Sequence, residues 1–110
     1  MNFKDIYSPP YKTDDMGLYI KSANNVTSFT IAANNPKEEA DNIVAVLNGT
    51  GGKKYKHLML YGGHKIVTSN ASVLITRGLG HLLGIEGMTL EEAYKTQDEF
   101  IEWTMKQLQE

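Results

Sequence analysis

Residues 89–108, TLEEAYKTQDEFIEWTMKQL, form the most regular stretch of the sequence and predict a long C-terminal helix. Thr89 and Glu92 have the spacing of a capping box, in which two side chains satisfy backbone N–H groups at a helix start. Glu91 adds negative charge near the positive end of the helix dipole. Uncharged side chains then recur at about 100° per residue and mark the face expected to be buried: Leu90, Ala93, Tyr94, Gln97, Ile101, Met105 and Leu108.

Two aromatic residues of this helix fall beside that face. Trp103 projects roughly 140° away from the apolar stripe, and Phe100 lies at the margin of the stripe on the same side. Large aromatic side chains off the buried face are typical of interfaces, so Phe100 and Trp103 are candidate interface residues for a homo-oligomer. A second interpretation stays open, in which an N-terminal arm with Pro9, Pro10 and Tyr11 folds over the helix and covers Trp103.

Two pairs of short apolar stretches, rich in β-branched and aromatic residues, predict β-hairpins. The first pairs residues 18–21 with 26–32 and turns at residues 23–25, where asparagine tolerates a left-handed backbone. The second pairs residues 64–68 with 72–77. The sequence therefore predicts an antiparallel hairpin in each half of the chain.

A second helix is predicted between the hairpins. Asn35 is a suitable N-cap, Pro36 suits the first helical position, and Glu38 completes a capping box. Asn48-Gly49 predicts the end of the helix. Residues 57–61 fit a short strand or a helical turn equally well, because the run is too short for periodicity to decide.

This order of elements, ββα-ββα, predicts an α+β domain of two layers, with two helices packed on one face of an antiparallel sheet. The two halves are compatible with a degenerate repeat, although no residue-level identity supports one. Residues 1–15 are expected to form an irregular arm and residues 16–110 a single domain. Apolar side chains are available to attach the arm to the domain, namely Phe3, Ile6, Tyr7 and Tyr11.

Composition excludes several classes of protein. A chain of 110 residues with 41% hydrophobic and 22% charged residues is typical of one globular domain. It has no cysteine, no apolar run of membrane-spanning length and no N-terminal export signal, so we expect no disulfide, no membrane segment and a cytoplasmic location.

No pattern in the sequence indicates an enzyme, and we expect no cofactor and no metal site. The loop at residues 49–54 lacks the spacing of a Walker A motif, and the three histidines lack metal-ligand spacing. One catalytic hypothesis stays open, a polar pocket assembled from His64, Arg77 and His81.

Charge is unevenly distributed along the chain. Residues 51–85 carry five basic residues and no acid, whereas residues 86–110 carry seven acids and two lysines. The fold therefore has either a basic and an acidic face, or two segments that neutralise each other. The basic face would suit an anion or a nucleic acid, with the candidate residues Lys53, Lys54, Lys56, Lys65 and Arg77.

The stretch RGLGHLLG at residues 77–84, followed by TLEEA at 89–93 and QDEF at 97–100, resembles a C-terminal pattern of small uncharacterised phage and prophage proteins. Leu79 stands where that pattern has an aromatic residue. The resemblance implies a phage or prophage origin and a bacterial cytoplasm, and it implies no activity and no catalytic residue. The leading hypothesis is a small accessory protein that self-associates through its last helix and binds a host or phage macromolecule. The alternative hypothesis is an anion or nucleic-acid binding protein.

Overall fold

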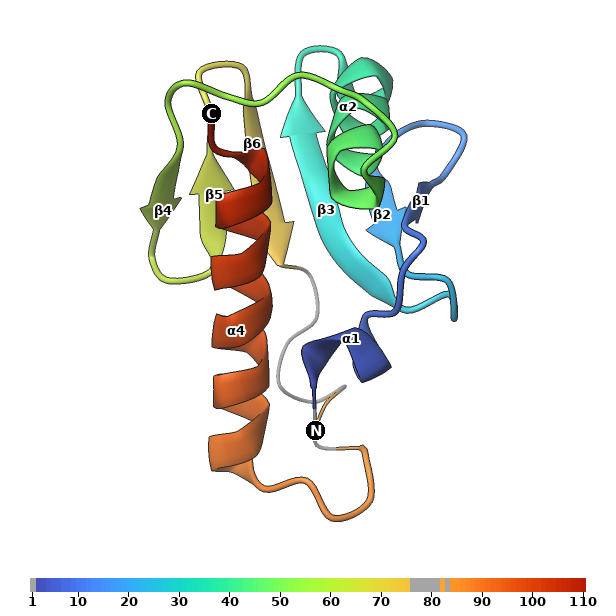
Figure 1. Ribbon diagram of the computed structural model, residues 1–110, viewed down its shortest axis with the longest axis vertical. Coiled ribbons are helices and arrows are strands. Elements are labelled where there is room, and N and C mark those ends of the chain that lie inside the picture. Colours follow the sequence, from blue (N-terminus) through green and yellow to red (C-terminus); the bar gives the residue numbers. More distant parts are fainter. Residues whose placement is uncertain (1, 76–81, 83) are drawn as a thin grey trace.

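The computed structural model describes residues 2–75, 82 and 84–110 (Figure 1). Its strands form one six-stranded antiparallel sheet, and helices pack on it, which confirms the α+β class. The elements, in chain order, are α1 (Phe3–Ile6), β1 (Lys12–Thr13), β2 (Tyr19–Lys21), β3 (Thr27–Ala33), α2 (Pro36–Asn48), β4 (Met59–Tyr61), β5 (Lys65–Val67), β6 (Ala71–Ile75) and α4 (Leu90–Leu108).

The sheet has the strand order β1-β2-β3-β6-β5-β4. Each half of the chain contributes three consecutive antiparallel strands and then a long helix, and the halves join through the β3–β6 pair. In the described part of the chain, each half thus has three strands before its long helix, because β1 and β4 extend the two predicted hairpins. Residues 57–61, for which strand and turn were both open, contain strand β4.

Local sequence explains the turns and helix ends. Asn25 adopts a φ of 66° in the β2–β3 turn, the left-handed conformation that asparagine tolerates. Gly49 ends α2 with a φ of 71°, and the Thr89 hydroxyl accepts from the Glu92 N–H at the start of α4. The side chain of Asn35 differs from the expected cap, because its amide donates to the Glu38 carboxylate and does not accept a backbone N–H.

Helices α2 and α4 lie side by side on the same face of the sheet, in front of the strands in Figure 1. Between the layers lies a cluster of aromatic rings centred on Phe100, which is fully buried. The ring of Phe100 stacks on Tyr7 with centroids 4.4 Å apart, and it lies 5.0 Å from the ring of Phe29 in β3. This cluster ties the last helix to the sheet.

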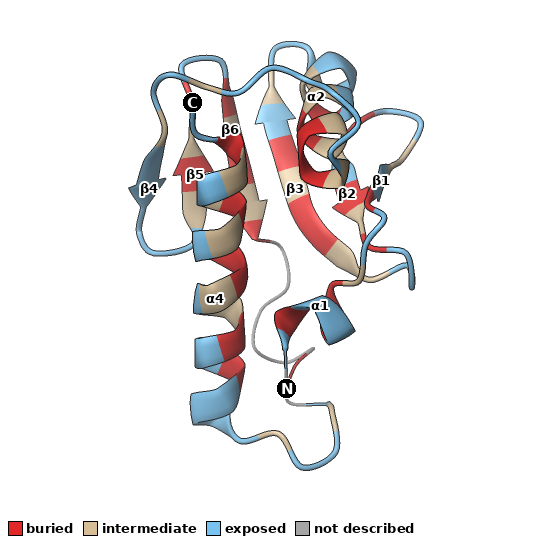
Figure 2. Ribbon diagram, in the orientation of Figure 1, coloured by how far each residue is buried: buried red, intermediate tan, exposed pale blue. Residues whose placement is uncertain are grey.

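The buried face of α4 differs from the predicted one (Figure 2). Leu90 and Tyr94, expected to be buried, are 52% and 53% exposed. Thr96 and Thr104 are buried instead, and each hydroxyl donates to the carbonyl four residues earlier, at 2.7 and 2.8 Å. Because those internal bonds satisfy the hydroxyls, threonine is tolerated in the interface, and the buried face is rotated toward Phe100.

The N-terminal segment is part of the same core. The four apolar side chains expected to attach it are all buried in the cluster that contains Phe100. Two features within residues 1–15 were not expected, the one-turn helix α1 and the strand β1, which pairs with β2. Asn48 of α2 fixes the segment further, since its side-chain amide bonds both the N–H and the carbonyl of Tyr11, at 2.7 and 2.8 Å.

None of the helices in the described part of the chain is long and apolar enough to span a membrane.

Replacing Phe100 with alanine should lower the free energy of unfolding by about 3–5 kcal/mol, because it leaves a cavity in the centre of the aromatic cluster. Phe100→Leu, which keeps an apolar side chain there, should cost less. Urea denaturation followed by circular dichroism measures both. Tyr94→Ala, on the exposed side of the same helix, is the matched control and should change stability by no more than about 0.5 kcal/mol. Similar losses for Phe100→Ala and Tyr94→Ala would contradict the assigned core.

Candidate functional site

The face of the sheet that the helices leave uncovered is the most distinctive surface of the molecule. Strand register defines this open face, because residues directly opposite each other in an antiparallel pair point to the same side. One row crosses five strands, from Tyr19 through Thr30, Leu74 and Lys65 to Tyr61. With the residues above and below this row, the open face comprises Lys12, Tyr19, Lys21, Thr30, Ala32, Met59, Tyr61, Lys65, Val67, Ser72 and Leu74.

Alternation along each strand produces this separation. Ile20, Phe29 and Ile66 point to the helices and are fully buried, so their neighbours in the strands point away. Tyr19 and Tyr61, at the two ends of the central row, are 42% and 64% exposed. Met59 is 58% exposed on the same face. Exposed apolar and aromatic side chains on one face commonly mark a surface that contacts a partner.

The charged side chains that the strands contribute to the open face are all basic. The six strands of the described structure contain three lysines, Lys12, Lys21 and Lys65, and no acidic residue. Register places all three lysines on the open face. In contrast, α2 and α4 together contain eight acidic residues and three lysines, a net charge of −5. The fold therefore separates charge by layer, with a basic sheet face and an acidic helical layer.

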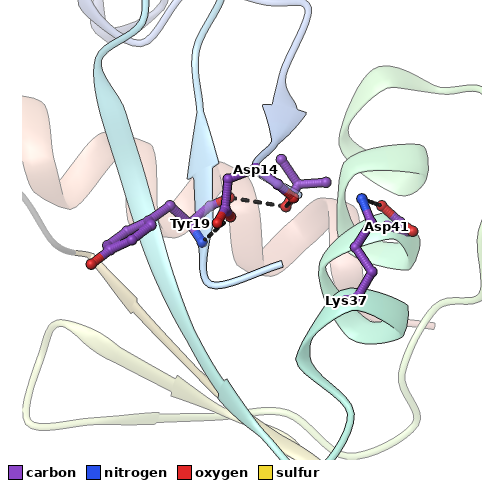
Figure 3. A network of polar contacts seen from close by, with 5 residues as sticks. Asp14, Tyr19, Lys37 and Asp41 are labelled. Atoms are coloured by element: carbon purple, nitrogen blue, oxygen red, sulfur yellow. Dashed lines mark hydrogen bonds and ion pairs between the residues drawn. The ribbon is translucent and has the colours of Figure 1, made fainter. Parts of the chain in front are cut away.

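Tyr19 is held in place by the turn between β1 and β2 (Figure 3). The Asp14 carboxylate accepts from the Tyr19 N–H at 2.8 Å, and the Thr13 hydroxyl donates to the Tyr19 carbonyl at 3.0 Å. The hydrogen bond from Tyr19 lowers the pKa of Asp14 below its usual value. Figure 3 shows the ring of Tyr19 pointing away from α2, whose Lys37 and Asp41 form an ion pair within the helix. These two hydrogen bonds hold the backbone of Tyr19, and its ring projects from the open face.

At the other end of the row, Tyr61 lies directly opposite Lys65 in the β4–β5 pair. A groove of about 450 Å³ lies where β4 begins and β5 ends, and its lining residues include His57, Met59 and Thr68. None of its lining residues carries a carboxylate side chain. A second groove, of about 460 Å³, shares Thr68 and Ser69 with the first and extends to Ala32 and Ser72. Basic and neutral polar groups therefore border the open face at this edge.

The structure separates the basic residues that the sequence grouped together. Lys65 lies on the open face, whereas Lys53, Lys54 and Lys56 lie on the loop between α2 and β4. Arg77 lies outside the described residues. The loop residues Lys53 and Lys54 share a groove of about 640 Å³ with the carboxylates of Glu38 and Glu39. This mixture of charges makes the loop a weaker anion site than its composition suggests.

Hydrogen bonds hold the loop against α2. Asn42 accepts from the Lys53 N–H at 2.7 Å and donates to the Lys53 carbonyl at 3.0 Å. The Lys53 N–H is therefore already engaged, and it is not free to bind a phosphate as a glycine-rich phosphate loop would. Tyr55 anchors the loop through its hydroxyl, which donates to Glu39 at 2.6 Å. Burial and this hydrogen bond raise the pKa of Tyr55.

The two candidate interface residues both pack against other parts of their own chain. Phe100 is fully buried and offers no surface to a partner, which corrects its assignment to the margin of the apolar stripe. Trp103 is half-buried beneath the N-terminal segment, with ring centroids 5.5 Å from Phe3 and 5.9 Å from Tyr11. The Lys4 ammonium lies 5.1 Å from the centre of the Trp103 ring, in cation–π geometry. This arrangement matches the interpretation in which the arm covers Trp103.

The remaining chemical hypotheses receive no support from the described residues. His64 is exposed in the β4–β5 turn, and His81 and Arg77, its expected companions in a pocket, lie outside the described residues. No group of three histidine, aspartate or glutamate side chains that could hold a metal occurs in the part of the chain that the structure describes. In the stretch RGLGHLLG that resembles phage proteins, residues 77–81 and 83 also lie outside it.

The residues of the open face that the sequence reasoning missed include Lys12, Tyr19 and Lys21. A signal for two of them was present, because Tyr19 and Lys21 flank the buried Ile20, just as Lys65 precedes the buried Ile66. Such alternation places these side chains on the outer face of a half-buried strand. Counting charge by segment obscured this pattern, because Lys12 and Lys21 belong to residues 1–34, where three lysines and three aspartates give a net charge of zero.

No protein-family model, curated protein or solved structure matches the chain significantly.

Stability should decrease at alkaline pH through Tyr11. Burial raises the pKa of Tyr11 from 10.0 to about 12. Below pH 10 the phenol is neutral in both the folded and the unfolded chain, so its contribution is constant. Between pH 10 and 12 only the unfolded chain ionises, and the free energy of unfolding should fall as the pH rises. Tyr11→Phe should make this decline smaller in urea denaturation at about pH 9 and pH 11, whereas the exposed control Tyr94→Phe should leave it unchanged.

The contact between Trp103 and the N-terminal segment can be tested by fluorescence, since Trp103 is the single tryptophan of the chain. Phe3→Ala removes a ring centred 5.5 Å from the indole, so the emission should shift to the red and acrylamide should quench it more strongly. Leu90→Ala, at an exposed position of the same helix, should change neither property. If Phe3→Ala left the emission unchanged and dilution shifted it, Trp103 would face another chain.

Proposed function

We propose that the protein acts by binding a macromolecular partner through the open face of its sheet. The observation that carries this proposal is that α2 and α4 both lie on one face of the sheet. Helices bury one face, and the strands described here expose Tyr19, Met59 and Tyr61 on the other, beside three lysines and no acid. Tyrosine and methionine are enriched in contact surfaces, and a face of this composition costs solubility unless a partner uses it.

The phage or prophage origin and the bacterial cytoplasm belong to this proposal as its setting, and they rest on the resemblance of residues 77–100 alone. Self-association through Phe100 and Trp103 is not part of it, because Phe100 is fully buried and Trp103 is partly buried against the N-terminal segment of its own chain. The alternative of an anion or nucleic-acid binding protein keeps Lys65 as a member of the contact surface. It loses the loop lysines Lys53 and Lys54, whose neighbours include two carboxylates.

Photocrosslinking in the producing cell tests the contact surface whatever the chemical class of the partner. An azidophenylalanine is introduced in place of Tyr61, in place of Tyr19, or in place of Tyr94 as a control. Tyr94 is as exposed as the two sheet tyrosines but lies on α4, in the acidic layer. We expect irradiated cells to give discrete higher-mass adducts with the probe at positions 61 and 19, and none at position 94.

Two outcomes would overturn the proposal. Adducts that form equally from all three positions would show indiscriminate collisions, and an absence of adducts from positions 61 and 19 would show that the open face has no partner in those cells. Circular dichroism of each purified variant checks that the fold is intact, which is expected because all three rings are exposed.

A further inference from the structure

Building on this proposed function, we infer that the partner of the open face is a single-stranded nucleic acid. In this arrangement the strand crosses the sheet roughly perpendicular to the β-strands. Its bases stack on Tyr19 and Tyr61, and its phosphates lie near Lys12, Lys21 and Lys65. The argument rests on three properties of the face, namely its charge, the spacing of its rings and its shape.

Charge favours a polyanion. Lysine is depleted in protein–protein interfaces, yet every charged residue in the six described strands is a lysine that points to the open face. The acidic helices, with a net charge of −5, lie on the opposite side of the sheet. They repel a phosphate backbone from the helical layer and make the sheet the favourable side for its approach. The overall charge of −2 therefore does not argue against binding of nucleic acid.

The spacing of the two tyrosines suits an extended strand. Tyr19 and Tyr61 stand in one row across β2, β3, β6, β5 and β4, so four strand intervals of ~4.8 Å separate their backbones by about 19 Å. Each ring has a lysine nearby on the same face. Lys21 is two residues along β2 from Tyr19, and Lys65 lies opposite Tyr61 in the β4–β5 pair. At each end of the row, a base can therefore stack on a tyrosine ring while the adjacent phosphate lies near a lysine.

Shape favours single strands over duplexes. Exposed rings on a sheet stack on unpaired bases, which a duplex does not offer. Duplex DNA is read by a helix or a two-stranded ribbon that enters a groove, and the long helices described here are acidic. The middle of the row contributes the hydroxyl of Thr30 and the apolar side chain of Leu74, between the two tyrosines. These groups can pack against the sugars and bases of a nucleic acid of any sequence.

Fluorescence anisotropy with the purified chain and defined probes tests the inference. The probes are fluorescein-labelled dT12, rU12 and a 12-base-pair duplex, a length within the range of about 4–16 nucleotides that small single-strand binding folds occupy. We expect a single-stranded probe to bind more tightly than the duplex. With three lysines engaged, affinity should fall about 20-fold between 50 and 200 mM salt, since the logarithmic slope for single strands is about −0.7 per neutralised phosphate.

Variants separate stacking from charge. Tyr61→Ala and Tyr19→Ala should each weaken binding about tenfold or more without changing the salt slope. Lys65→Gln should lower that slope by about 0.7. Tyr94→Ala and Lys106→Gln, both at exposed positions of α4, are the matched controls and should bind like the unmodified chain. The double variant Lys53→Gln/Lys54→Gln should also bind normally, because those lysines lie on the loop.

The outcomes distinguish this inference from the proposed function. The inference is overturned if none of the single strands binds at 50 mM salt, if the duplex binds as tightly, or if Lys53→Gln/Lys54→Gln weakens binding more than Tyr61→Ala. If the photoadducts from position 61 then keep their mass after nuclease treatment, the open face binds a protein and the proposed function survives. Nuclease-sensitive adducts together with the expected variant pattern support both.

Discussion

The stacking of Phe100 on Tyr7 and its contact with Phe29 connect three parts of the chain that are far apart in the sequence. Tyr7 belongs to the N-terminal segment, Phe29 to the central strand β3, and Phe100 to the last helix. Aromatic rings bury large apolar areas and gain further from offset stacking, so this cluster fixes which face of α4 meets the sheet. It also explains why the first residues are a structural part of the domain and not a loose arm.

The aromatic packing around Phe100 takes place on one face of the sheet, and the residues that the structure describes form no covering layer on the opposite face. The acidic residues lie mainly on the solvent side of α2 and α4, where they are hydrated. The charged residues of the six described strands are all lysines. This division has an electrostatic consequence. A small domain with a net charge of −2 presents a positive surface on one side, since the opposite charges are separated by the thickness of two layers and are partly screened from each other at physiological salt. Total charge is therefore a poor guide to what this domain can bind.

The sequence predicted the secondary structure and the class of fold where local signals were strong. Asn24-Asn25 at the first turn, Pro36 and Gly49 at the ends of α2, and Thr89 at the start of α4 all act within a few residues. The buried face of α4 could not be obtained in the same way. Thr96 and Thr104 carry polar hydroxyls, and these are acceptable in the core because they bond to carbonyls of their own helix. The members of the open face follow from the pairing register of the strands, which cannot be predicted from single segments of sequence. Helix α1 depends on packing against α4, through the contact of Phe3 with Phe100.

The edges of the sheet add a reason why a partner would use the face. Strand β1 has two residues and β4 has three, so each edge offers few free N–H and C=O groups for pairing with another chain, and short edge strands are a common protection against such pairing. Affinity from strand addition would therefore be small, whereas the face presents a row of side chains that crosses five strands. Each half of the topology supplies one tyrosine and a neighbouring lysine to that row, Tyr19 with Lys21 and Tyr61 with Lys65. A ligand that follows the row meets the same pair of groups at both ends, which favours an extended chain with a repeating chemical structure over a compact partner with a single recognition point.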